Sequence, residues 1–327
     1  MHKTLTISKL IKIKKMTLIQ LEYIVALNKY RHFVTAAEKC FVTQPTLSMQ
    51  IQKLEEELDM KIFDRSKQPI EPTVIGEKII KQAMIVLESA NKIPEMIEEI
   101  RGNIKGDLNI GIIPTIAPYL VPLFITQTIK EYPGLHIQIE ELLTDQIVDA
   151  LINNDLDIGI IATPLKESGI REIPLYYEPF VVFSSKEHRF FKKEKINPAD
   201  LSIDDMWLLN EGHCFSSHAI NLCGADQVKT QSLALNYRSG SLESLSKLVE
   251  QQYGYTLMPW LSLLDMEERK KELVREFNAP IPKREISIIV KDTFLKEKMV
   301  TAIKEKIMEN IPEELKTLGD GMLVDWK

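Results

Sequence analysis

Residues 33–55 read FVTAAEKCFVTQPTLSMQIQKLE, and this stretch predicts a helix-turn-helix unit. A short helical segment around the Ala36-Ala37 pair is followed by residues 41–44, which are too few for anything but a turn. Pro45 comes next, and proline is well tolerated in the first turn of a helix. The apolar residues that follow recur at helical spacing and form one face: Leu47, Ile51, Leu54 and Leu58.

The other face of this second helix carries groups that could read DNA. Beside Pro45, its outward polar residues are Gln44, Thr46, Ser48, Gln50, Gln52 and Lys53. Amides and hydroxyls read base edges, and lysine contacts phosphates. Residues 62–72 predict a hairpin or wing, in which Arg65, Ser66 and Lys67 could contact phosphates or the minor groove. Residues 16–73 hold seven Lys or Arg against eight Asp or Glu, so charge alone leaves a merely solvated helix face open.

The segments on either side of this unit have different characters. Residues 1–15 carry lysines and no acid, which predicts a disordered basic extension. Residues 74–104 show a long apolar stripe that one helix cannot bury alone, which indicates a linker helix that dimerises. Pro94 interrupts the stripe, and we expect the helix to kink or break there.

Residues 105–315 alternate between strand-like and helix-like stretches, which predicts an α/β regulatory domain with mostly parallel sheets. The expected strands are 108–113, 135–140, 156–161, 180–184, 207–209, 233–237, 255–258 and 286–291. The length favours two lobes with a site between them. We expect lobe I at about 105–178 and 282–315, lobe II at about 179–281, and a tail at 316–327.

Composition limits the class of protein. The chain has 327 residues, a net charge of −6 and 3 cysteines. No window of about 18 consecutive apolar residues occurs, so we expect no membrane association. Three cysteines are too few for a disulfide framework, which favours a cytoplasmic protein. The acidic balance argues against a general nucleic-acid coat protein.

Two of the cysteines, Cys214 and Cys223, lie nine residues apart. If the residues between them are helical, the Cα atoms are roughly 13–14 Å apart. A disulfide needs about 4.4–6.8 Å, so bonding would require the segment to rearrange. Such a pair could be a redox switch, or two unrelated buried thiols. The third cysteine, Cys40, has apolar neighbours and reads as a small buried hydrophobe.

Residues 33–55 resemble the winged helix-turn-helix of LysR-type transcription regulators. The matching features are Ala36-Ala37, Thr43-Gln44-Pro45, Leu47-Ser48, Gln50-Ile51 and Leu54-Glu55. Residues 62–77, IFDRSKQPIEPTVIGE, resemble the wing and the start of the linker helix of that family. The resemblance covers residues 16–315. It implies a DNA-binding head, a dimerising helix and a two-lobed, Rossmann-like effector domain of the periplasmic-binding-protein type.

A second resemblance is to the hydrogen peroxide sensors within this family. Gly212-His213-Cys214 and Cys223 match their cysteine motif, and IPTIAPYLVP (residues 113–122) also resembles them. The resemblance implies that Cys214 is the peroxidatic thiol and Cys223 the resolving one. It implies further residues of the peroxide pocket: Thr115, Thr144, His213 and, across a length difference, Arg284. The residues between the cysteines, FSSHAINL, depart from the pattern of these sensors.

The predicted function is therefore an activator of oxidative-stress genes that senses peroxide through a reversible Cys214–Cys223 disulfide. The implied partners are promoter DNA, a second copy in a homodimer or dimer-of-dimers tetramer, RNA polymerase, hydrogen peroxide, and a reductant such as glutaredoxin or thioredoxin. No metal or cofactor is expected. The alternative is a regulator that binds a small organic ligand between the lobes. An enzyme using Cys214 and His213 is disfavoured, because adjacent residues rarely form a nucleophile–base pair.

Overall fold

The computed structural model describes residues 16–101, 104–210, 212–224, 237, 239–251 and 253–325. The chain forms two compact units, Met1–Ile97 and Glu98–Lys327. The expected basic extension, residues 1–15, lies outside the described residues. No helix within the described ranges is long and apolar enough to cross a membrane.

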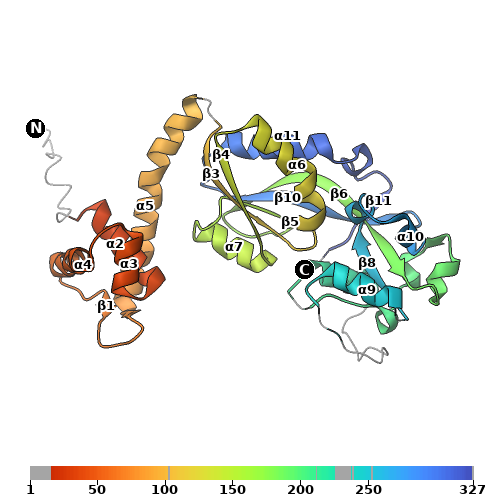
Figure 1. The fold of residues 1–327 in the computed structure, drawn as a ribbon, viewed down its shortest axis with the longest axis horizontal. Helices are drawn as coiled ribbons and strands as arrows, with labels where there is room; N and C mark the ends of the chain where they lie inside the picture. Colours follow the sequence, from red (N-terminus) through yellow and green to blue (C-terminus); the bar gives the residue numbers. More distant parts are fainter. Residues whose placement is uncertain are drawn as a thin grey trace, which may run out of the picture. The chain divides into compact units, whose positions relative to one another are not determined.

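The first unit is a helical bundle with a small hairpin (Figure 1). Its elements are α2 (Leu18–Tyr30), α3 (Phe33–Lys39), α4 (Gln44–Leu58), β1 (Phe63–Asp64) and β2 (Glu71–Pro72). The two strands pair antiparallel, with Phe63 opposite Pro72. Pro45 lies in the first turn of α4, and Leu47, Ile51 and Leu54 are fully buried on its inner face. The predicted helix-turn-helix and wing are therefore confirmed.

Of the two outcomes expected at Pro94, a break of the linker helix is wrong, and a kink stays a prediction. Helix α5 (Val74–Arg101) runs through this proline without ending. Proline removes one backbone hydrogen bond and crowds the preceding turn, but the many other bonds of a long helix can hold it together. The expected linker extended to residue 104, and residues 102 and 103 lie outside the described residues.

The second unit is an α/β domain built on one mixed sheet (Figure 1). Its strands are β3 (Gly106–Ile112), β4 (Leu135–Glu141), β5 (Ile158–Thr163), β6 (Ile170–Ser184), β7 (Lys195–Ile196), β8 (Tyr255–Pro259), β9 (Val274–Phe277), β10 (Ile281–Lys291) and β11 (Gly321–Leu323). Its helices are α6 (Ala117–Glu131), α7 (Thr144–Ile152), α8 (Cys214–Leu222), α9 (Leu242–Gln251), α10 (Glu268–Lys271) and α11 (Glu297–Asn310). The predicted α/β class is confirmed.

The expectation of mostly parallel sheets was wrong. Parallel pairs join β4 to β3, β3 to β5, β7 to β9 and β10 to β11, but β10 runs antiparallel to both β5 and β6. Strands β8 and β9 also lie antiparallel to β6. The reason is that the chain crosses between the lobes twice. Strand β6 carries it out of the first lobe and β10 carries it back, so the two long strands point in opposite directions.

Each lobe has its own apolar core. On β6, the core of the first lobe includes Tyr176, and the core of the second lobe begins at Phe180. Around β10, the second core includes Phe277 and the first resumes at Ile286. Cys214 belongs to the first core although its helix is part of the second lobe. The start of α8 therefore contacts the opposite lobe.

Three segments differ from the expected strands and tail. Residues 207–209 form no strand. They are flanked by an isolated bridge from Met206 to Tyr255, and Leu209 makes a second isolated bridge to Ser239. The expected strand at 233–237 lies outside the described residues except for Tyr237. The expected tail instead contributes β11, which pairs with the start of β10.

Candidate functional site

A buried arginine organises the boundary between the lobes. Arg284 on β10 donates from Nε and Nη2 to Glu178 Oε2, at 3.0 and 2.7 Å. Its Nη1 donates to the Thr115 hydroxyl and its Nη2 to the Thr115 carbonyl, both at 3.0 Å. Both members of the Arg284–Glu178 ion pair are buried, so removing either side chain would leave the other as an uncompensated buried charge.

The Cys214 thiol is buried beside this cluster. Cys214 is the first residue of α8, and the ring of its neighbour Phe215 lies under the Arg284 guanidinium, 4.9 Å from centroid to Cζ. Burial raises the pKa of Cys214, whereas the charge of Arg284 and the Thr144 hydroxyl act to lower it. The net direction is upward, so the resting thiol is mostly protonated near neutral pH.

The Thr144 hydroxyl gives the site an unused hydrogen-bonding position. Thr144 begins α7 and is 3% exposed. Although it influences the thiol, its oxygen makes no hydrogen bond of ordinary geometry to any described residue. A buried hydroxyl without a partner carries a desolvation cost that a small polar guest would relieve.

His213 lies directly before α8 and is largely buried. It is the N-cap residue of α8, but its side chain makes no capping hydrogen bond. Its Nε2 lies against Gly240, 3.5 Å from the position that a Cβ would take there. Burial lowers the pKa of His213, so the ring is neutral near pH 7 and supplies no positive charge to the neighbouring thiol.

Cys223, at the other end of α8, has different neighbours. Burial and, after it, the nearby Asp205 carboxylate together raise its pKa to about 11, although the Tyr255 hydroxyl acts to lower it. Asp205 also binds His188, with 2.9 Å between its Oδ2 and the His188 Nε2. Its other carboxylate oxygen is buried and has no hydrogen-bond partner among the described residues.

Helix α8 keeps the two thiols apart, as the sequence predicted for a helical segment. It spans Cys214–Leu222, with Cys223 as its C-cap, and both cysteines are free thiols. Nine helical steps correspond to roughly 13–14 Å between the Cα atoms. His218 strengthens the helix internally, because its Nδ1 lies 2.8 Å from the Cys214 carbonyl oxygen. A bond between the two sulfurs requires α8 to change conformation.

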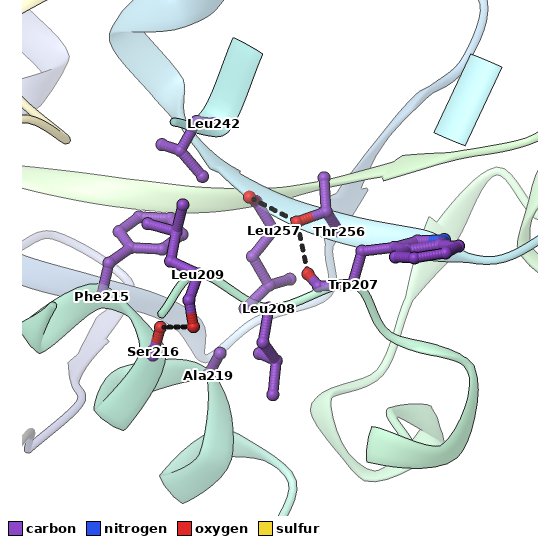
Figure 2. A pocket seen from close by; sticks show the side chains of 9 residues that line it. All are labelled: Trp207, Leu208, Leu209, Phe215, Ser216, Ala219, Leu242, Thr256 and Leu257. Atoms are coloured by element: carbon purple, nitrogen blue, oxygen red, sulfur yellow. Dashed lines mark hydrogen bonds between the residues drawn. The ribbon is translucent and has the colours of Figure 1, made fainter. Parts of the chain in front are cut away.

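A small apolar hollow lies behind α8 (Figure 2). Its lining residues are Trp207, Leu208, Leu209, Phe215, Ser216, Ala219, Leu242, Thr256 and Leu257. The polar side chains in its wall are already bonded: Ser216 donates to the Leu209 carbonyl and Thr256 to the Trp207 carbonyl (Figure 2). It has room for about one water molecule, so it is too small for an organic effector.

In the first unit, α4 presents an outward stripe opposite its buried face. The exposed residues are Pro45, Met49, Gln52, Lys53 and Glu56, and Gln52 donates to Glu56 at 2.9 Å. Several other predicted DNA residues are half-buried: Gln44, Thr46, Ser48 and Gln50. The Thr46 hydroxyl contacts that of Thr43 at 2.8 Å, and the side-chain oxygen Oε1 of Gln50 accepts from Nε2 of Gln20 at 3.4 Å.

The predicted residues of the wing also have intramolecular partners. Arg65 reaches back to the buried carboxylate of Glu55 at 3.4 Å and lies over the Phe33 ring. The Ser66 hydroxyl donates to Asp64 at 2.6 Å, and Lys67 pairs with Glu71. Glu55 also accepts from the backbone N–H groups of Ile62 and Phe63, which ties the wing to α4. Arg65 is therefore partly a structural residue.

Two residues of these sites escaped the sequence analysis. Glu178 holds Arg284 in place, and the available signal was a lone acid within the apolar run LYYEPFVVFS (residues 175–184). Met49 is 61% exposed at the centre of the outward stripe of α4. A thioether is not among the amides, hydroxyls and cations that read base edges and phosphates, so the residue type of Met49 gave no signal.

Comparison with known proteins accounts for both units. Residues 18–77 match the bacterial regulatory helix-turn-helix of the lysR family. Residues 101–307 match the LysR substrate binding domain. These matches explain the DNA-binding head and the two-lobed domain together.

Individual relatives indicate which type of LysR regulator this chain resembles. A hydrogen peroxide-inducible genes activator of Pectobacterium carotovorum subsp. carotovorum is 32% identical over 93% of this chain and 100% of its own length. The DNA-binding transcriptional dual regulator OxyR of Escherichia coli is 33% identical over 84% of this chain and 89% of its own. A full-length OxyR variant from Pseudomonas aeruginosa has 34% identity and a TM-score of 0.74, covering 90% of this chain and 99% of its own. These relatives are regulators and not enzymes. The chain therefore belongs to the LysR family of bacterial transcription regulators, and within that family it is of the OxyR, hydrogen peroxide-inducible activator type.

Proposed function

We propose that this regulator senses hydrogen peroxide by forming a reversible disulfide between Cys214 and Cys223. The observation that carries the proposal is the position of the two thiols at opposite ends of α8. One of them lies near the buried Arg284 cation and the Thr144 hydroxyl, and Arg284 in turn binds the Thr115 hydroxyl, so these polar groups gather at an apolar lobe boundary.

The polar groups suit a small neutral substrate. Arg284 donates to the Thr115 oxygen, which leaves the Thr115 hydrogen for a guest. The Thr144 hydroxyl is unpartnered among the described residues and adjoins the thiol. Peroxide can accept and donate hydrogen bonds, and the Arg284 charge favours both the Cys214 thiolate and the negative charge that develops on the departing oxygen. His213 would act as a neutral hydrogen-bonding group.

The redox step is balanced by two electrons. The Cys214 thiolate attacks one peroxide oxygen, the O–O bond breaks, and hydroxide leaves while the sulfur becomes a sulfenic acid. The Cys223 sulfur then attacks the Cys214 sulfur; the S–O bond breaks, the S–S bond forms and water leaves with the Cys223 proton. Two electrons pass from the thiols to peroxide. A dithiol reductant of the glutaredoxin or thioredoxin class would return them.

The output follows from the geometry of α8. Because the disulfide cannot form while residues 214–223 are helical, oxidation must remodel α8 and the lobe boundary that its first turn contacts. In a homodimer or tetramer, such a change would alter the spacing of the DNA-binding heads and hence the contact with RNA polymerase.

The DNA contacts are assigned to the outward side of α4 and to the wing. Pro45, Gln52 and Lys53 are exposed, and the half-buried Gln44, Thr46, Ser48 and Gln50 border them. In the wing, Ser66 and Lys67 are exposed, and Arg65 would have to share its charge between Glu55 and a phosphate. We assign Lys53 to a phosphate, a contact that carries no sequence information, so we expect Lys53→Ala to weaken binding to all sequences.

The test combines thiol titration with DNA footprinting, before and after peroxide. The full chain should lose two thiols on oxidation and change its footprint on promoter DNA, and Cys214→Ser should do neither. If Cys214→Ser responds to peroxide like the unaltered chain, the proposed mechanism is wrong. A thermal shift by an organic ligand that survives loss of both cysteines would support a ligand-responsive regulator instead.

A further inference from the structure

The C-terminal segment is fastened to the strand that carries Arg284. Strand β11 runs parallel to the start of β10, with Gly321 opposite Ile281 and Leu323 opposite Lys283. The Ile281 N–H donates to the Asp320 carbonyl at 3.0 Å, and the Val324 N–H donates to the Lys283 carbonyl at 2.9 Å. The next residue of β10 after Lys283 is Arg284. The tail therefore lines the strand up to the residue that precedes the buried cation.

Side-chain packing fixes this segment in place. Val324 is 8% exposed and belongs to the apolar core of the second lobe. At Gly321, an added Cβ would lie 2.6 Å from the Cδ of Lys283 and 2.7 Å from the Leu318 carbonyl oxygen. A side chain there would have to displace the Lys283 side chain and would crowd the Leu318 carbonyl oxygen, so the tight turn into β11 favours glycine.

The end of the segment contacts the redox helix. Asn221, in the last turn of α8, donates from Nδ2 to the Asp325 carbonyl at 2.7 Å. This bond joins residues 104 positions apart in the chain. The bond anchors α8 at a residue between the two cysteines, two positions before Cys223. The helix is thus held at its first turn by the pocket and at its last turn by the tail.

We propose that residues 320–325 are a positioning segment that holds α8 in its helical, reduced form. The inference rests on the proposed Cys214–Cys223 switch. In a glutathione buffer, the dithiol and oxidised glutathione exchange to the protein disulfide and two reduced glutathione molecules, with two electrons transferred. Because the tail contacts α8 in the dithiol form, its loss shifts this equilibrium toward the disulfide.

The experiment measures the disulfide fraction across glutathione redox buffers, by alkylation and mass spectrometry of the intact chain. It compares the full chain with a chain ending at Asp320, each with and without Asn221→Ala. We expect the shortened chain to favour the disulfide by about tenfold, which is about 30 mV in midpoint potential. With Asn221→Ala already present, shortening should have at most a third of that effect, because the bond to α8 is already lost.

Asn310→Ala is the matched control. Asn310 ends α11 and donates from Nδ2 to the Lys306 carbonyl at 2.8 Å, but it has no connection with α8. We expect it to leave the midpoint unchanged. Equal midpoint potentials for the full and shortened chains would overturn the inference. It would also be overturned if shortening shifted the midpoint potential equally with and without Asn221→Ala. If the shortened chain does not fold, a midpoint unchanged by Asn221→Asp, which replaces the donor by an acceptor, would overturn it. Absence of any disulfide in the full chain would instead refute the proposed function.

Discussion

The two ends of α8 present the same thiol in opposite electrostatic settings. Cys214, at the first turn, lies near the Arg284 cation and the Thr144 hydroxyl. Cys223, at the C-cap, lies near the Asp205 carboxylate. The helix dipole adds to the contrast, because it favours negative charge at the N-terminus and opposes it at the C-terminus. Burial is the largest cause that raises both pKa values; the next largest cause opposes it at Cys214, where it is Arg284, and adds to it at Cys223, where it is Asp205.

This contrast explains why one thiol would attack peroxide and the other would wait. A thiolate is the nucleophile, and a positive neighbour increases its population. In the proposed switch, the negative neighbour of Cys223 would keep its proton in place until α8 rearranges. The charges at the two helix ends would then set the order of oxidation.

The largest effect is expected from replacing the resolving thiol, because this separates the reaction at one end of α8 from the reaction at the other. Cys223→Ser should abolish the disulfide while leaving the reaction of Cys214, because the pocket around Arg284 is untouched. We expect a sulfenic acid at Cys214 that dimedone traps after peroxide, detected by mass spectrometry. Cys40→Ser is the control and should still form the disulfide. Equal dimedone labelling of Cys214 and Cys223 in the unaltered chain would show that the two ends do not differ.

Removing the cation should disturb the Cys214 end strongly. Arg284→Met leaves Glu178 buried without its partner, and we expect a loss of about 3–5 kcal/mol in the free energy of unfolding. Urea denaturation measures this loss. Arg171→Met is the matched control, because Arg171 pairs with Glu297 at the surface and should contribute less than about 1 kcal/mol. Similar losses in the two variants would contradict the central place of Arg284.

Acid should weaken the middle of the helix. Burial and the Arg284 charge lower the pKa of His218 to about 3, below the ordinary value of about 6.5 for the unfolded chain. Between these values only the unfolded state binds the proton, so stability is full above pH 6.5 and falls as the pH falls. From pH 6.5 to 5 the loss should be about 2 kcal/mol.

Denaturation at several pH values measures this loss. His218→Leu should remove that part of the pH dependence, whereas His136→Leu, at an exposed position, should keep it. A pH dependence that His218→Leu does not change would show that another group is responsible.

The smallest effect is expected at the Cys223 end. Asp205→Asn removes a negative charge and should lower the pKa of Cys223 from about 11, although burial remains the larger cause. In a Cys40→Ser, Cys214→Ser background, alkylation at pH 8 should become a few-fold faster, since the rate follows the thiolate fraction. Asp204→Asn is the neighbouring control. If Asp205→Asn slows alkylation, the proposed sign of the field at this end is wrong.

Although the helical state of residues 214–222 was only one of the conformations considered, the sequence carried enough information for the fold class and the helix-turn-helix. These features depend on local periodicity and on positions such as Pro45 and Leu47, whose effects are visible within one element. Strand direction could not be predicted in the same way. Whether β10 runs parallel or antiparallel to β6 depends on how the chain crosses between lobes, and no local pattern reports that.

The cysteines and Arg284 were identified from motifs, but their surroundings were not. Glu178, Asp205 and Asn221 act through partners 106, 18 and 104 positions away, so spacing could not connect them with Arg284, Cys223 or the tail. The tail itself lies beyond the matched domain, and its strand becomes recognisable only when it pairs with β10.

Peptide mapping after one equivalent of hydrogen peroxide tests the central claim most directly. The reduced chain contains 3 free thiols. The account predicts that two disappear together, that the linked peptides are those of Cys214 and Cys223, and that Cys40 stays free. Three remaining thiols, or a linkage that includes Cys40, would contradict it.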